Sequence, residues 1–219
     1  TNLTYAFVTP GVAMKSKKKK PKISFKHIFL FLVGVLICSS LYIYVRSNES
    51  VHYEKLKPVS TTDEKININV PEKMTEVQRG IATIDYEHRL SDQNQSLVSH
   101  IRIESQYFGS DVLQSTKKEI INQLKQKNGE YYEIFKNKTN TNPAAKDLSF
   151  IGFTDYKLAE QDGIISDFTY KYDDSVVVGR LLLLFGEDTI YFGIIESTEK
   201  VWQDNLDIWN KIFESLRIG

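Results

Sequence analysis

Apolar and polar positions follow their most regular pattern in the last third of the chain. Four runs, at 149–158, 164–172, 176–185 and 189–196, carry apolar residues that either alternate with polar ones or follow one another directly. The breaks between the runs are short and rich in Asp, Gly and Ser, which accept turn geometry. Because short connections join antiparallel neighbours, we predict a four-stranded antiparallel meander.

Strands and one helix are expected before the meander. Alternation predicts strands at 66–70, 81–86 and 97–105, and an extended segment at 131–135. The segment 111–127 has the 3.6-residue periodicity of an amphipathic helix, with Ser110 or Asp111 as its cap and Asn128-Gly129 as its end. Its apolar stripe consists of Val112, Leu113, Ile120, Ile121 and Leu124.

A second amphipathic helix is expected at 198–216. Apolar residues recur there every three or four positions and include Trp202 and Trp209. Two tryptophans seven residues apart on an apolar stripe favour a place in the core over a stacking surface for a sugar or partner. The fold class is therefore α+β: an antiparallel sheet that ends in the meander and is flanked by two amphipathic helices.

The N-terminal region has a different pattern. Residues 28–45 are 18 residues without a charge, which is long enough for a helix to cross a hydrocarbon core of about 30 Å. A lysine block lies directly before this stretch and favours a cytoplasmic N-terminus with an outward-facing C-terminal domain. The residues that define the anchor and its topology are Lys17, Lys18, Lys19, Lys20, Lys22, Lys26, Ile28 and Val45.

The chain accordingly divides into five parts. Residues 1–13 are unlike the rest and precede Met14, so we treat them as a non-native or upstream extension. A basic cytoplasmic segment at 14–27, a transmembrane anchor at 28–45 and a polar linker at 46–65 precede the extracytoplasmic domain at 66–219. We favour a retained anchor, and leave cleavage after Ser40 and lipidation of Cys38 as alternatives, although Ile37 is large for a lipidation signal.

The charge distribution limits the classes of partner that the domain can bind, and the cysteine content shows how the domain is stabilised. Residues 1–46 carry eight basic residues and no acidic ones, which leaves 20 basic and 28 acidic residues in 47–219, a net charge of −8. An external domain of that sign is not expected to bind nucleic acid, whereas the lysine block would contact anionic membrane lipid. Cys38 is the only cysteine, so the domain is held by its core without a disulfide. The Lys-, Asn- and Ile-rich composition suggests a bacterial source.

Candidate chemistry is sparse. The sequence has no nucleophile elbow, no phosphate-binding glycine loop and no His-Glu-x-x-His motif, so we expect no enzyme activity and no cofactor. His88 and His100, with Asp85 and Glu104, could form a metal site across paired strands, but solvated surface histidines are the favoured interpretation. One of Tyr131 and Tyr132 could be exposed for binding.

The stretch 66–216 resembles one superfamily. The segments ININVPEKM and DVLQSTKKEIINQLKQ, the meander and the closing FESLRI occur in the order typical of the photosystem II protein PsbP, the Ran-binding protein Mog1 and bacterial envelope lipoproteins of the DcrB type. The resemblance implies an α-β-α sandwich that acts as an assembly or binding module without catalytic residues. It transfers no functional residue, because the superfamily shares no active-site motif.

Three functions remain as hypotheses. The first is a non-enzymatic, membrane-anchored extracytoplasmic protein that binds another protein or supports envelope assembly. The second is an immunity-type protein that neutralises a toxin arriving from outside, since an acidic domain can steer a basic partner. The third is a metal-dependent hydrolase that uses His88, His100 and the nearby carboxylates.

Overall fold

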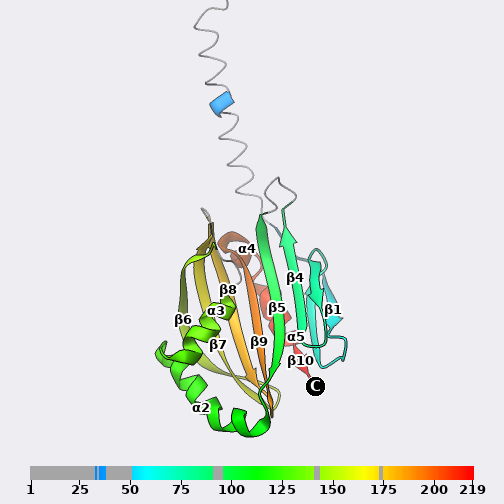
Figure 1. Ribbon diagram of the computed structural model, residues 1–219. Helices are drawn as coiled ribbons and strands as arrows, with labels where there is room; N and C mark the ends of the chain where they lie inside the picture. Colours follow the sequence, from blue (N-terminus) through cyan, green and yellow to red (C-terminus); the bar gives the residue numbers. More distant parts are fainter. Residues whose placement is uncertain (1–32, 34, 38–50, 91–95, 141–143, 173–174) are drawn as a thin grey trace, which may run out of the picture. The chain divides into compact units, whose positions relative to one another are not determined.

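The computed structural model describes residues 33, 35–37, 51–90, 96–140, 144–172 and 175–219 (Figure 1). The chain divides into two units, Thr1–Glu49 and Ser50–Gly219. In the first unit, residues 33 and 35–37 are helical. No helix among the described residues is long and apolar enough to cross a membrane. The basic segment at 14–27 and most of the predicted anchor at 28–45 lie outside the described residues, so both stay predictions.

The second unit is a mixed α+β domain, as the hydrophobic pattern predicted. Its first half contains β1 (Leu56–Ser60), β2 (Ile66–Pro71), β3 (Thr75–Arg79), β4 (Thr83–Arg89), β5 (Leu97–Tyr107), α2 (Ser110–Gln126) and α3 (Glu130–Thr139). Its second half contains β6 (Lys146–Leu158), β7 (Gln161–Tyr172), β8 (Ser175–Phe185), β9 (Thr189–Thr198), α4 (Glu199–Asp204), α5 (Leu206–Ser215) and β10 (Arg217–Ile218).

Two antiparallel sheets organise the domain. The larger sheet has seven strands in the order β3-β4-β5-β9-β8-β7-β6, and the smaller has the order β1-β2-β10 (Figure 1). Strands β6 to β9 are hydrogen-bonded in sequence, which confirms the predicted four-stranded meander. Strand β5 then pairs with β9, so the first-half strands β3 to β5 extend the meander into one continuous sheet.

The seven-stranded sheet separates two apolar cores. The first core joins one sheet face to α4, α5 and the small sheet, and it includes the fully buried Trp209. The second core joins the opposite face to α2 and α3, and it includes Phe150 and Phe168. Alternation along β9 supplies both, since Ile195 belongs to the first core and Ile194 to the second. The architecture is the α-β-α layering that the resemblance implied.

The predicted linker at 46–65 was wrong in its second half. Residues 56–60 form β1, which pairs with β2, and Val59 packs in the first core. Ahead of β1, the amide of Tyr53 donates a hydrogen bond of 2.8 Å to Asn205 Oδ1, and Asn205 Nδ2 donates to Val51 O at 2.6 Å. These long-range bonds fix a segment whose local composition is that of a tether.

Two further predictions need correction. Asn205 divides the predicted helix at 198–216 into α4 and α5, and its side chain bonds Val201 O and the backbone of the segment ahead of β1. Helix α2 begins at Ser110 with Gly109 in the cap position, and neither Ser110 nor Asp111 caps it. Strand β3 was not predicted. Its five residues are all exposed at the edge of the sheet, so no apolar alternation marks it.

Candidate binding pocket beneath α3

The reversal between α2 and α3 positions the pocket. Lys127 ends α2 in the left-handed conformation (φ 54°), and Gly129 precedes α3 with φ 87°. Gln123 Oε1 accepts a hydrogen bond of 2.8 Å from the amide of Tyr131, so a side chain of α2 satisfies the first turn of α3. A Cβ at Gly129 would lie 2.4 Å from Gln123, so glycine permits this close approach.

The helical conformation of α3 contradicts the extended segment predicted at 131–135. Tyr131, Ile134, Phe135 and Lys138 have the i, i+3, i+4, i+7 spacing of one helix face, a signal that was present in the sequence. The Gln123 bond and the acidic residues of its first turn favour the helix over a strand. Tyr131 and Tyr132 are both half-buried, so neither lies on the strand face that was proposed for binding.

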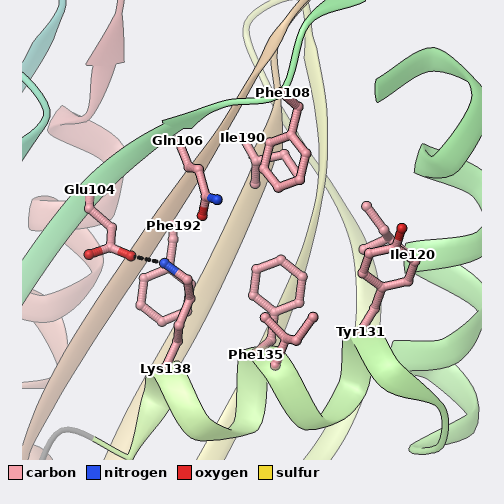
Figure 2. Close-up of a pocket in the computed structure, with 10 residues that line it drawn as sticks. Glu104, Gln106, Phe108, Ile120, Tyr131, Phe135, Lys138, Ile190 and Phe192 are labelled. Carbon is pink, nitrogen blue, oxygen red and sulfur yellow. Dashed lines mark hydrogen bonds and ion pairs between the residues drawn. The ribbon is translucent and has the colours of Figure 1, made fainter. Parts of the chain in front are cut away.

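A cavity of about 150 Å³ lies between α3 and the sheet. We call it the α3 cavity. Figure 2 shows the Glu104–Lys138 pair at one end of it and Ile120 with Tyr131 at the other. The rings of Phe135 and Phe192 are nearly parallel, with centroids 6.2 Å apart. Its lining residues are Glu104, Gln106, Phe108, Ile120, Tyr131, Ile134, Phe135, Lys138, Ile190 and Phe192.

The rim of the α3 cavity carries paired charges. Glu104 bonds Lys138 Nζ through one carboxylate oxygen and accepts from Arg102 Nη2 at 2.6 Å through the other. Lys138 Nζ also lies 5.7 Å from the ring centre of Phe192. Burial alone would raise the pKa of Glu104, but the hydrogen bonds and charges of Lys138 and Arg102 outweigh it and lower that pKa. Glu104 is therefore ionised, and two cations share its single carboxylate.

Two uncharged lining residues, one apolar and one polar, are exposed at the surface. Ile134 is 40 % exposed, and Gln106 is exposed near the end of β5. The deeper lining residues Ile120, Phe135, Ile190 and Phe192 are buried. The α3 cavity is thus an apolar hollow with a mixed polar and apolar entrance.

A charged strip continues the same sheet face beside the α3 cavity. Among the described residues, the second core takes no side chain from β3, β4 or β5. Polar residues occupy this face of β5 instead, because Ile101 and Ile103 face the first core and His100, Arg102 and Glu104 alternate with them. The helices α2 and α3 therefore cover the meander side of the sheet with apolar contacts, and charged pairs fill the remainder.

His100 is the centre of this strip. Its Nε2 lies 2.9 Å from Asp85 Oδ1 and its Nδ1 lies 3.1 Å from Glu196 Oε1, so two carboxylates from neighbouring strands flank one buried ring. Burial lowers the pKa of His100, but the hydrogen bonds and charges of Asp85 and Glu196 outweigh it and raise the pKa to about 9. A doubly protonated ring can donate to both partners. The prediction that His100 is a solvated surface residue was wrong.

The structure brings His100 and Asp85 together, but not the four residues of the metal hypothesis at one point. His88 pairs in register with Ser99, and its Nδ1 lies 2.8 Å from Tyr53 Oη on the first-core face, opposite to His100. Both ring nitrogens of His100 already face carboxylates, and Glu104 is held by Lys138 and Arg102. Within the described ranges, no cluster of three or more His, Cys, Asp or Glu side chains could hold a metal ion.

The structure also gives the positions of the two tryptophans that the sequence singled out. Trp202 and Trp209 lie in the first core with stacked rings 5.7 Å apart, as the apolar stripe predicted. The six anchor lysines, Ile28 and Val45 lie outside the described residues. The α3 cavity itself was not predicted, because its lining comes from four segments whose proximity only the strand order creates.

Comparisons with known proteins point to the fold alone. No family model and no curated protein matches the sequence. The cyanobacterial PsbP (CyanoP) of Synechocystis matches at a TM-score of 0.51 and 11% identity, over 77% of this chain and 95% of that one. LpqN of Mycobacterium tuberculosis, which is involved in cell envelope biogenesis, matches at 0.43 and 13%, over 80% and 94%.

A protein of Bacteroides thetaiotaomicron matches at a TM-score of 0.44 and 11% identity, over 74% of this chain. The match spans 48% of that protein, so this chain corresponds to about half of its length. The likeness to CyanoP covers nearly all of that protein and most of the described domain. The described domain therefore has a PsbP-like fold, as the order of its sequence segments predicted.

Proposed function

We propose that the protein is a non-enzymatic, single-pass membrane protein whose extracytoplasmic domain binds another protein of the cell envelope at the entrance of the α3 cavity. The observation that carries the proposal is an apolar hollow in the second core that reaches the surface at Ile134. Energetic centres of protein interfaces are well-packed pockets that receive an apolar anchor, and polar groups surround them. The α3 cavity and its charged rim have this arrangement.

The frame around the entrance is suited to binding. The floor comes from β9, which lies in the interior of the seven-stranded sheet, and the roof is α3, whose first turn is tied to α2 by Gln123. A pocket on rigid elements costs little ordering on association. The predicted anchor at 28–45, with its lysine block, would hold this domain outside the membrane, where envelope partners are available.

The test is affinity capture of the tagged full-length protein from gently solubilised native membranes, followed by mass spectrometry. We expect one partner in near-stoichiometric amount. Ile134→Lys, which places a charge at the entrance, should remove this partner. Ile151→Lys changes an isoleucine that is 69 % exposed on the edge strand β6 and is not part of the cavity lining, so it should retain the partner. Loss of the partner from both variants, or from neither, would contradict the proposal.

A further inference from the structure

We infer that the α3 cavity receives one uncharged apolar side chain of the partner, of leucine or phenylalanine size, which inserts between α3 and β9. The inference rests on the proposed function and names the group that is recognised. Size, charge and access each restrict the occupant, and the three restrictions agree on a single side chain.

Size excludes a large ligand. A cavity of about 150 Å³ matches engineered apolar cavities of roughly the same volume that accept benzene. Pockets that enclose whole drug-sized ligands have about 300–1,000 Å³. The occupant is therefore one ring or one branched alkyl group, which is the size of the end of a hydrophobic side chain.

Charge excludes an ionic occupant. The lining is almost entirely apolar, and its two charged residues, Glu104 and Lys138, bond each other. A second cation, Arg102, bonds the same carboxylate. A buried charge needs a partner of opposite sign. The only carboxylate of the lining is already bonded to both cations, so it is not free for a charged occupant. An uncharged apolar group gains burial without disturbing the rim.

The position of the entrance at the surface favours an apolar side chain that a partner peptide inserts from outside, while the polar backbone of that peptide stays at the rim. Ile134 and Gln106 are the exposed members of the lining, so the entrance has an apolar edge and a neutral hydrogen-bonding edge. A peptide that inserts one apolar side chain would meet Gln106 and the Glu104–Lys138 pair with its backbone polar groups. Charged side chains would stay outside, where the partner remains in contact with water.

The first step of the test uses fluorobenzene, an uncharged single ring, as the probe. Titration of the full-length protein in lipid nanodiscs should give a saturable ¹⁹F signal. Ile190→Phe adds volume at the buried floor and should weaken fluorobenzene binding by at least about tenfold. Ile151→Phe makes the same change on the exposed face of β6 and should bind as the wild type does, and it also measures uptake by lipid. Phe192→Trp fills the same space from a second position, in case Ile190→Phe does not fold.

The second step repeats the affinity capture with the filled variants. Loss of both fluorobenzene and the partner in Ile190→Phe or Phe192→Trp, with both retained in Ile151→Phe, supports the inference. A filled variant that loses fluorobenzene but keeps the partner overturns it and leaves the proposed function intact. Absence of any partner with the wild type overturns the proposed function, and fluorobenzene binding alone then assigns the cavity to a small molecule or lipid group. A wild type that does not bind fluorobenzene also overturns the inference.

Discussion

The two cores on opposite faces of the seven-stranded sheet are closed in different ways. In the first core, Trp202 and Trp209 stack, Tyr53 meets Trp209 edge-on at 5.3 Å, and Trp209 Nε1 donates to Trp202 O at 3.1 Å. In the second core, α3 covers the sheet but leaves the α3 cavity, whose lining residue Ile134 is exposed. Filled space stabilises a fold, whereas unfilled apolar space at an entrance is available for binding.

Truncation of a buried aromatic side chain should give the largest difference in unfolding free energy between the two cores. Trp209→Ala is expected to lower the free energy of unfolding by about 3–5 kcal/mol, because it removes a fully buried ring from packed surroundings. Phe192→Ala in the second core should cost less, since one side of its ring already borders the α3 cavity. Urea denaturation of the full-length protein in detergent measures both values. An equal or larger loss for Phe192→Ala would mean that the second core is as tightly filled as the first.

The pH dependence of stability should differ between the two faces. The folded-state pKa of His100 is about 9, above its ordinary value of about 6.5, so its contribution is complete below pH 6.5 and is lost as the pH rises towards 9. Burial and the charge of Lys73 lower the pKa of His88, so its contribution is present above pH 6.5 and is lost as the pH falls.

Urea midpoints between pH 5 and pH 10 test this contrast. His100→Gln should remove most of the alkaline loss, and His88→Gln should remove part of the acid loss. Removal of His100 also leaves Asp85 and Glu196 without the imidazolium between them, so we expect a cost of about 3–5 kcal/mol near neutral pH. An alkaline loss of unchanged size in His100→Gln would show that this ring is neutral in the folded protein.

Added volume, like truncation, should destabilise the protein more in the first core than in the second. Ile190 and Ile195 lie on β9 and face the second and the first core respectively. Ile195→Phe is expected to destabilise the protein by about 1–3 kcal/mol, as overpacking does. Ile190→Phe should be neutral or stabilising, because the new ring can occupy the α3 cavity. Thermal unfolding of the two variants decides this, and similar losses would remove the distinction between the cores.

The smallest effect is expected at the rim. Lys138→Gln breaks one ion pair of Glu104, but Arg102 still holds the carboxylate, so the stability cost should stay below about 1 kcal/mol. Lys125→Gln, which breaks an exposed pair with Asp155, is the matched control. If Lys138→Gln alone lowered the free energy of unfolding by several kcal/mol, the Glu104–Lys138 pair would be a main source of stability for the fold, which would contradict this prediction.

The parts of the fold that are encoded locally could be predicted from the sequence. The meander, α2 and the core position of Trp202 and Trp209 follow from periodicity and turn residues. Contacts between distant segments were missed for a physical reason: the segment ahead of β1 is fixed by the bond of Tyr53 to Asn205, and the first turn of α3 is bonded by Gln123 of α2. Neither partner can be chosen from spacing alone.

The candidate site could not be predicted from the sequence for the same reason. The pairing of β5 with β9 places Glu104 near Phe192 and His100 near Glu196, and strand order was not fixed by the pattern. His100 looked exposed because the other residues on its face of β5, Arg102 and Glu104, are polar, but the two carboxylates that bury it come from β4 and β9. A polar alternation therefore marked a charged internal strip, which the sequence could not distinguish from a solvated face.

The most direct test of the central claim is site-specific photo-crosslinking in intact native membranes, with benzoylphenylalanine placed at position 134 or at position 151. Both isoleucines are exposed, but only Ile134 lines the α3 cavity. We predict one crosslinked protein from position 134, attached at or beside an apolar residue of the partner, and none from position 151. No crosslink from position 134, or the same products from both positions, would contradict the assignment of the α3 cavity as the binding site.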